Sequence, residues 1–135
     1  MVEISSTFEL EYAPIDDDHK HLAEIVNEIV DALDAKDLAL GAELMRKFVD
    51  TTRTHFTDEE ALLTRHKYPH IDEHKAHHAM LVHKLESLKD MSEKVAANTH
   101  AAESLRKELI YFLMDDIINE DLNFKKFINE VASKI

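Results

Sequence analysis

The stretch His55-Phe56-Thr57-Asp58-Glu59-Glu60 indicates the fold of this chain. His55 and Glu59 are four residues apart, which on an α-helix is a rotation of about 400°, so their side chains lie on one face. The same spacing recurs at His74 and His78. An imidazole and a carboxylate on one helix, facing two imidazoles on another, can bind a transition metal. The rest of the chain can be read as the scaffold for that arrangement.

The composition favours one domain built from long helices. A length of 135 residues is typical of a single domain, here residues 1–135, and is enough to bury a core. One Gly and two Pro are too few for a chain rich in turns. The absence of Cys rules out disulfides, thiolate metal ligands and a cysteine nucleophile.

The charge excludes several classes of partner. A formal net charge of −12 argues against nucleic acid and disfavours an anionic membrane surface.

No run of the sequence approaches the ~20 apolar residues of a membrane span. The first residues lack the basic and apolar regions of a signal peptide, so we expect a cytoplasmic location. The outer helical faces are rich in charge, which predicts a monomer.

Apolar residues recur at helical intervals in four segments. Residues 1–15 lack that period and are expected to form an extended arm. Helices are predicted from the acids Asp16–Asp18 to near residue 36, from a cap at Asp37 to a break at Tyr68–Pro69, from about 70 to 95, and from 99 to near the C-terminus. Residues 98 and 99 form the third connection. Short connections predict an all-α, up-down-up-down antiparallel four-helix bundle with an extended N-terminal arm.

Several ionisable residues fall on these apolar faces, where leucines would otherwise stand. They are His19, His55, Glu59, His74, His78, Asp116 and Asp121. Buried ionisable groups cost several kcal/mol unless they are paired or bound to metal. A lone core His is usually only hydrogen-bonded, but that explanation does not suit a stack of imidazoles and acids. Imidazole and carboxylate without sulfur suit iron, manganese or zinc, and the set is too large for one tetrahedral zinc. Two metals bridged by carboxylates fit better.

The sequence resembles the bacterial hemerythrins, which are oxygen-binding, non-haem di-iron bundles. The resemblance runs from about Ile15 to Phe127. It is carried by Ile15-Asp16-x-x-His19-Lys20-x-Leu22, by His55-Phe56-x-x-Glu59-Glu60, and by Tyr68-Pro69-x-x-x-x-His74-x-x-x-His78. A fourth motif, from Phe112 to Phe124, keeps every landmark of the family except a His, at whose place Asp116 stands.

The resemblance implies a role for each matched position. His19 and His55 would be terminal ligands of one iron, which keeps an open position for dioxygen. His74 and His78 would bind the second iron, which the family's fifth His completes. Glu59 and Asp121 would bridge the two iron ions beside an oxo or hydroxo group. Asp116, as an ionised fifth ligand, would lower the charge of the centre by one unit and favour ferric ions.

Two neighbours leave the assignment open near the C-terminus. Glu120 lies four residues from Asp116 and would share its face on a regular helix, whereas Asp121 keeps the family's five-residue spacing. Asp121 is favoured for that reason. Asp115 is a weaker alternative to Asp116, because it shifts the register by one residue.

The remaining histidines are expected to be solvated or capping residues. They are His21, His66, His70, His83 and His100. His77 adjoins His78 and could support it.

The leading functional hypothesis is dioxygen binding, for sensing or scavenging, without enzymatic turnover. The alternatives are a di-iron oxidase or peroxidase, a metal-storage protein and a purely structural bundle. The absence of Glu-x-x-His pairs disfavours the ferritin-like oxidases.

Overall fold

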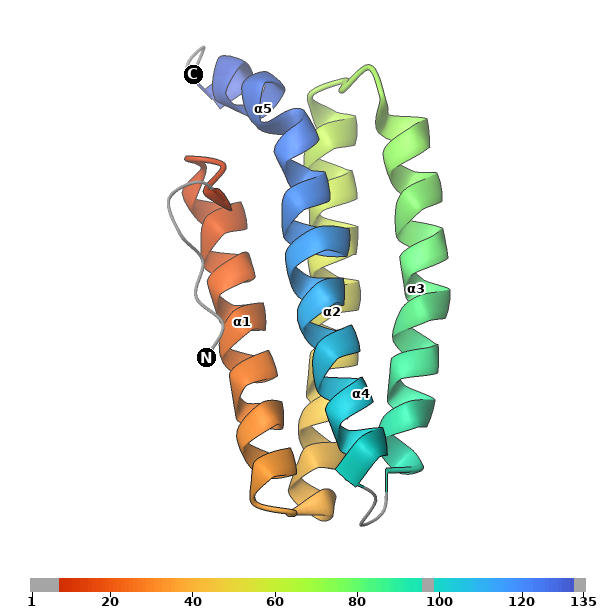
Figure 1. The fold of residues 1–135 in the computed structure, drawn as a ribbon. Coiled ribbons are helices and arrows are strands. Elements are labelled where there is room, and N and C mark those ends of the chain that lie inside the picture. Colours follow the sequence, from red (N-terminus) through yellow and green to blue (C-terminus); the bar gives the residue numbers. More distant parts are fainter. Residues whose placement is uncertain (1–7, 96–98, 133–135) are drawn as a thin grey trace.

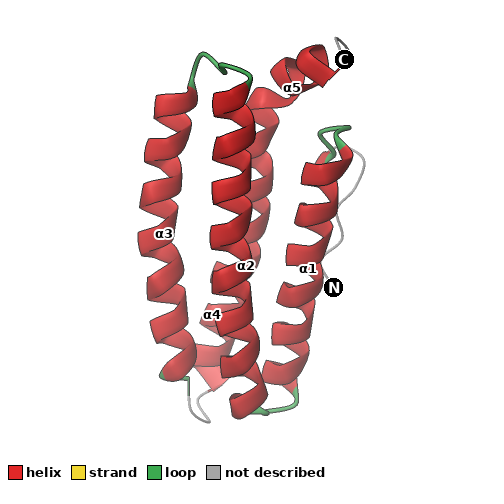
Figure 2. Cartoon of the chain, turned by 180° about the vertical axis from the view of Figure 1, so that it is seen from behind, coloured by secondary structure: helices red, strands yellow, loops and turns green. Residues whose placement is uncertain are grey.

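Four antiparallel helices form the body of the molecule (Figure 1). In the computed structural model, which describes residues 8–95 and 99–132, they are α1 (Ala13–Asp34), α2 (Leu38–Arg65), α3 (Ile71–Glu93) and α4 (Thr99–Tyr111). Each helix packs against the next, and α4 closes the ring against α1. The reverse view in Figure 2 shows helices and loops alone in the described part. The predicted all-α bundle is confirmed.

Parts of two predicted segments lie outside the described residues. These are residues 1–7 of the N-terminal arm and Asn98 of the third connection. Within the described ranges, no helix carries an apolar stretch long enough to cross a lipid bilayer.

The start of α1 corrects the sequence prediction. The helix begins at Ala13 rather than at Asp16, and Pro14 lies in its first turn, where its missing N–H costs nothing. Asp16 is therefore not a cap that precedes the helix. Its carboxylate instead reaches back from the first turn and accepts hydrogen bonds from the backbone N–H groups of Leu10 (2.8 Å) and Tyr12 (3.2 Å). These bonds fix the end of the arm against the helix.

The fourth helix is also less regular than predicted. After α4 the chain continues as a π-helix, η2 (Phe112–Asn119), then as a short 3₁₀ turn, η3 (Leu122–Phe124), and as α5 (Lys125–Ala132). Figure 1 shows α5 bending away from the axis of α4 at the end of the bundle where α1 begins. A π-helix bonds residue i to i+5, so it rotates the residues after it relative to a regular α-helix. This change of register brings Asp121 inward and leaves Glu120 half-buried.

A lysine in the left-handed conformation follows two residues after the last residue of both α1 and α2. Lys36 has a φ of 58° and Lys67 a φ of 59°. After α2, the N–H of Tyr68 donates to the carbonyl of Leu63 at 2.9 Å, and the N–H of Lys67 donates to that of Thr64 at 3.0 Å. This is the Schellman pattern, in which glycine is the usual residue because it lacks a Cβ. The same pair of bonds closes α1.

A layer of buried polar side chains lies between two apolar clusters. The larger cluster fills the body of the bundle, with Phe48, Leu85 and Phe112 fully buried. The smaller cluster closes the end near α5 and consists of Leu10, Ile15, Leu63, Tyr68, Phe124 and Ile128. Along α1, Ile15 and Leu22 stand about one turn to either side of the buried His19. The polar layer is thus sealed on both sides by hydrocarbon.

The left-handed lysine gives a first prediction. Lys67→Gly should stabilise the fold by about 1 kcal/mol, because glycine adopts a positive φ without the Cβ clash. Urea unfolding would measure the change. Lys47→Gly is the matched control: this exposed residue lies within α2, so the substitution should destabilise by about 1 kcal/mol. Equal losses in both variants would contradict the assigned C-terminal cap.

Candidate metal centre

Six ionisable side chains from four segments converge in the polar layer. His19 comes from α1, His55 and Glu59 from α2, His74 and His78 from α3, and Asp121 from the turn between η2 and η3. None is more than 7% exposed. Their potential ligand atoms form two groups, each within 4.8 Å. One group is His19, His55, Glu59 and Asp121, and the other is Glu59, His74, His78 and Asp121.

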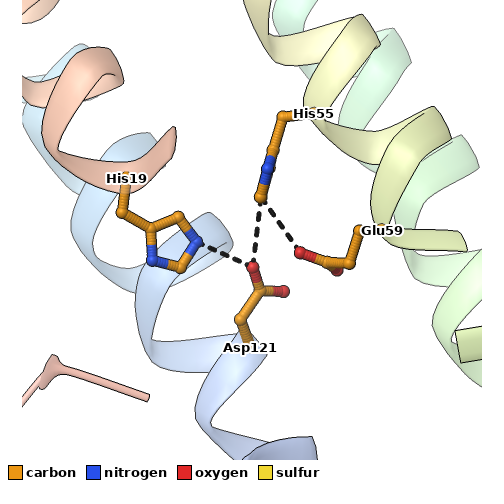
Figure 3. Close-up of side chains that lie close together, drawn as sticks. All are labelled: His19, His55, Glu59 and Asp121. Carbon is orange, nitrogen blue, oxygen red and sulfur yellow. Dashed lines mark hydrogen bonds and ion pairs between the residues drawn. The ribbon is translucent and has the colours of Figure 1, made fainter. Parts of the chain in front are cut away.

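In the first group the imidazoles of α1 and α2 face two carboxylates (Figure 3). Nε2 of His19 lies 2.9 Å from Oδ2 of Asp121. Nε2 of His55 lies 3.3 Å from that same oxygen and 3.0 Å from Oε2 of Glu59. One carboxylate oxygen therefore stands between two imidazoles that come from different helices.

The second group repeats this arrangement on α3. Nε2 of His78 lies 3.2 Å from Oε1 of Glu59, and Nε2 of His74 contacts the same oxygen. His74 also lies 3.8 Å from Oδ1 of Asp121. Each carboxylate thus offers one oxygen toward the α1 side and the other toward the α3 side, as a bridging ligand requires.

The charges of the layer depend on one another. Burial disfavours the carboxylate of Glu59, but its contacts with His55, His74 and His78 outweigh burial and hold its pKa well below the usual value. Burial also disfavours the imidazolium of His55, yet the neighbouring carboxylates hold its pKa well above the usual value. Burial and the nearby Glu59 raise the pKa of Asp121. A proton on His55 can therefore provide positive charge of the kind that a metal cation would provide.

The donor set fits a pair of transition-metal ions. It consists of four imidazoles and two shared carboxylates, without sulfur, which suits iron or another metal that accepts nitrogen and oxygen ligands. The buried Oε2 of Glu59 accepts no well-formed hydrogen bond, although it lies near His55. A buried oxygen left in this way normally costs free energy, and a metal ion would satisfy it.

Two acids orient the histidines from outside the cluster. Oδ2 of Asp18 lies 3.1 Å from Nδ1 of His55, and Oε2 of Glu60 lies 3.1 Å from Nδ1 of His78. Such partners fix the tautomer and the ring orientation of metal-binding histidines. The sequence analysis assigned neither acid a role at the metal centre: Asp18 stood only among the acids at the start of the first predicted helix, and Glu60 only beside Glu59 in a motif. Local spacing gave no signal, because each acid and its histidine come from different helices.

Asp116 lies outside both groups. Its carboxylate forms an ion pair with Nζ of Lys84 on α3 at 2.5 Å, and Nε2 of His77 donates to its backbone carbonyl at 3.3 Å. His77 therefore supports residue 116 rather than His78. The role of Asp116 as a ligand stays a prediction.

The alternatives weighed near the C-terminus also lie outside the cluster. Asp115 is exposed, and Glu120 accepts a hydrogen bond from the amide of Asn123 at 3.1 Å. The five histidines expected to be solvated or capping are exposed or half-buried, with His66 and His70 next to the ends of α2 and α3.

A family model described as the hemerythrin HHE cation binding domain matches residues 11–128. The chain belongs to the hemerythrin family. The bacteriohemerythrin of Pseudomonas aeruginosa is 26% identical over 121 residues, which cover 90% of this chain and 77% of the relative. The myohemerythrin of Theromyzon tessulatum is 31% identical over 83 residues, which cover 62% of this chain and 64% of that protein. The hemerythrin family binds non-haem iron and dioxygen.

The contact between Asp18 and His55 gives a second prediction. Asp18→Ala should weaken metal binding about 10-fold to 100-fold, because the imidazole loses the partner that orients it. Competition with a coloured chelator would measure the affinity. Asp50→Ala is the control, since Asp50 is exposed and lines the same surface cleft as Asp18. If the two variants bind metal equally well, Asp18 does not orient a ligand.

Proposed function

We propose that this protein holds two iron ions between α1, α2, α3 and the segment after η2, and that the pair binds dioxygen. The observation that carries the proposal is the sharing of two carboxylates by two groups of ligand atoms. The proposed ligands are His19 and His55 on one ion, His74 and His78 on the other, and Glu59 and Asp121 on both. A bridging oxo or hydroxo group would complete the pair.

When bound, the iron pair would supply the electrons for reversible oxygen binding. The residues of the chain hold, orient and protect it. The two apolar clusters exclude bulk water from the polar layer, so its electrostatic interactions are stronger than they would be in solvent. Asp18 and Glu60 keep two of the imidazoles in the orientation in which Nε2 faces the centre. We propose binding for sensing or scavenging, rather than enzymatic turnover.

The experiment that tests the proposal is metal analysis of the purified protein with visible spectra in the presence and absence of oxygen. We expect two irons per chain and an absorption band that appears with oxygen and fades when oxygen is removed. A protein that retains zinc alone, or one whose iron does not respond to oxygen, would contradict it.

Glu59 provides a third prediction. Glu59→Ala should lose both ions and lower the melting temperature, because this carboxylate belongs to both ligand groups. The neighbouring exposed acid gives the control, and Asp58→Ala should keep the wild-type metal content and melting temperature. Wild-type values in Glu59→Ala would show that the site is assigned wrongly.

The assembly state is a fourth prediction, and we propose a monomer. The large exposed apolar side chains of the described residues are Leu38, Leu40, Met80 and Tyr111, which come from three different helices. Light scattering at moderate salt should give the mass of one chain, and a stable dimer would contradict the proposal. The one-domain organisation and the cytoplasmic location also stay predictions.

A further inference from the structure

We propose that both ions of this centre, and not one alone, keep an open position for an outside ligand. The inference rests on the proposed function and concerns the ion between His74 and His78. It follows from the number of ligands that the described residues supply to each ion, and from the contacts that hold Asp116 away from the centre.

The two ligand groups are equivalent in composition. Each contains two imidazoles and the same two carboxylates. Two histidines with a carboxylate typically leave positions open on a non-haem iron, which binds about six ligands. With two imidazoles, two carboxylate oxygens and one bridging oxo or hydroxo group, each ion would have five ligands. One position then remains on each side of the pair.

Asp116 stands where the family's fifth His would bind the second ion, but its side chain is held away from the centre. The carboxylate of Asp116 pairs with Nζ of Lys84, and the exposed fractions of these side chains are 18% and 34%. The same ammonium group lies 4.8 Å from the centre of the Tyr111 ring, a distance at which a cation–π attraction adds to the ion pair. Lys84 is therefore fixed by α4 as well as by residue 116.

The backbone of residue 116 is held from the same helix. The side chain of His77 donates a hydrogen bond to the carbonyl of Asp116. α3 therefore holds residue 116 twice, through Lys84 at the carboxylate and through His77 at the main chain. To reach an ion, Asp116 would have to leave a half-buried ammonium group without its partner. That move would give up the ion pair, which solvent screens only in part because both side chains are partly buried.

The consequence is a centre in which each of the two ions has one position for an outside ligand. A diatomic ligand could bind to either ion or lie between them, whereas a centre with a third imidazole on one ion would admit a ligand on one side only. Small uncharged molecules and small anions with two donor atoms are the class that fits this arrangement.

The test is a titration of the di-ferrous protein with nitric oxide, which binds ferrous iron at an open position. We expect two nitric oxide molecules per pair of irons in the wild type, counted by the change in the visible and infrared spectra. Asp116→His should reduce the number to one, because the longer, neutral imidazole is not held by Lys84 and would fill the position on the second ion. One nitric oxide per pair in the wild type would overturn the proposal, as would two in Asp116→His.

Two further variants separate the causes. Asp115→His introduces the same side chain at the exposed neighbouring position and should keep two nitric oxide molecules per pair. In Lys84→Met, Asp116 loses its partner and becomes free to bind the ion. The number of nitric oxide molecules bound per pair of irons should therefore fall from two toward one. An unchanged number in Lys84→Met would show that Lys84 does not keep the position open.

Iron content distinguishes failure of this inference from failure of the proposed function. A wild-type protein that does not hold two irons contradicts the di-iron centre itself. A protein that holds two irons but binds one nitric oxide contradicts the second open position alone.

Discussion

Two carboxylates buried side by side are the constraint on which this structure depends. Glu59 and Asp121 are each about 2% exposed and lie in one layer, where their like charges repel. Positive charge beside the two groups relieves this repulsion, and so does a proton on Asp121, whose pKa is raised by burial and by Glu59. Four imidazoles surround them, and contacts with the carboxylates raise the pKa values of two of these, His55 and His78, which favours their protonated forms. The proposed pair of metal ions would supply positive charge at the same place.

The bundle provides the rigidity that this layer requires. α2 places His55 and Glu59 one turn apart, and α3 does the same for His74 and His78, so four of the proposed ligands are fixed by two regular helices. The apolar clusters above and below the layer prevent the helices from sliding, because a shift would bury a charge in hydrocarbon or expose a core residue. A site on regular elements also holds its geometry better than one built on loops.

The period of the sequence was sufficient to predict the four helical segments and to single out the histidines and Glu59 of the polar layer. Asp121 was preferred to Glu120 only on the spacing of the hemerythrin motif, and Asp116, predicted with the others, lies outside the cluster. Positions such as His19 and His78 stand out because they interrupt apolar faces that are otherwise continuous. The features that could not be predicted depend on partners distant in sequence. Asp18 and Glu60 look like surface acids until α1, α2 and α3 are assembled. The pairing of Asp116 with Lys84 requires the packing of η2 against α3. The left-handed lysines at the ends of α1 and α2 occupy positions where glycine is the usual signal. The π-helix shows in the sequence only as the five-residue interval between the buried pairs Phe112-Leu113 and Ile117-Ile118, which a search for the α-helical period does not detect.

We propose that the two ligand groups hold two separate ions that share both carboxylates. A crystal structure of the iron-loaded protein, with anomalous data collected on both sides of the iron absorption edge, would test this arrangement. We expect two iron peaks, one bounded by His19 and His55 and one by His74 and His78, with Glu59 and Asp121 in contact with both. A single peak, or a peak outside the polar layer, would contradict it.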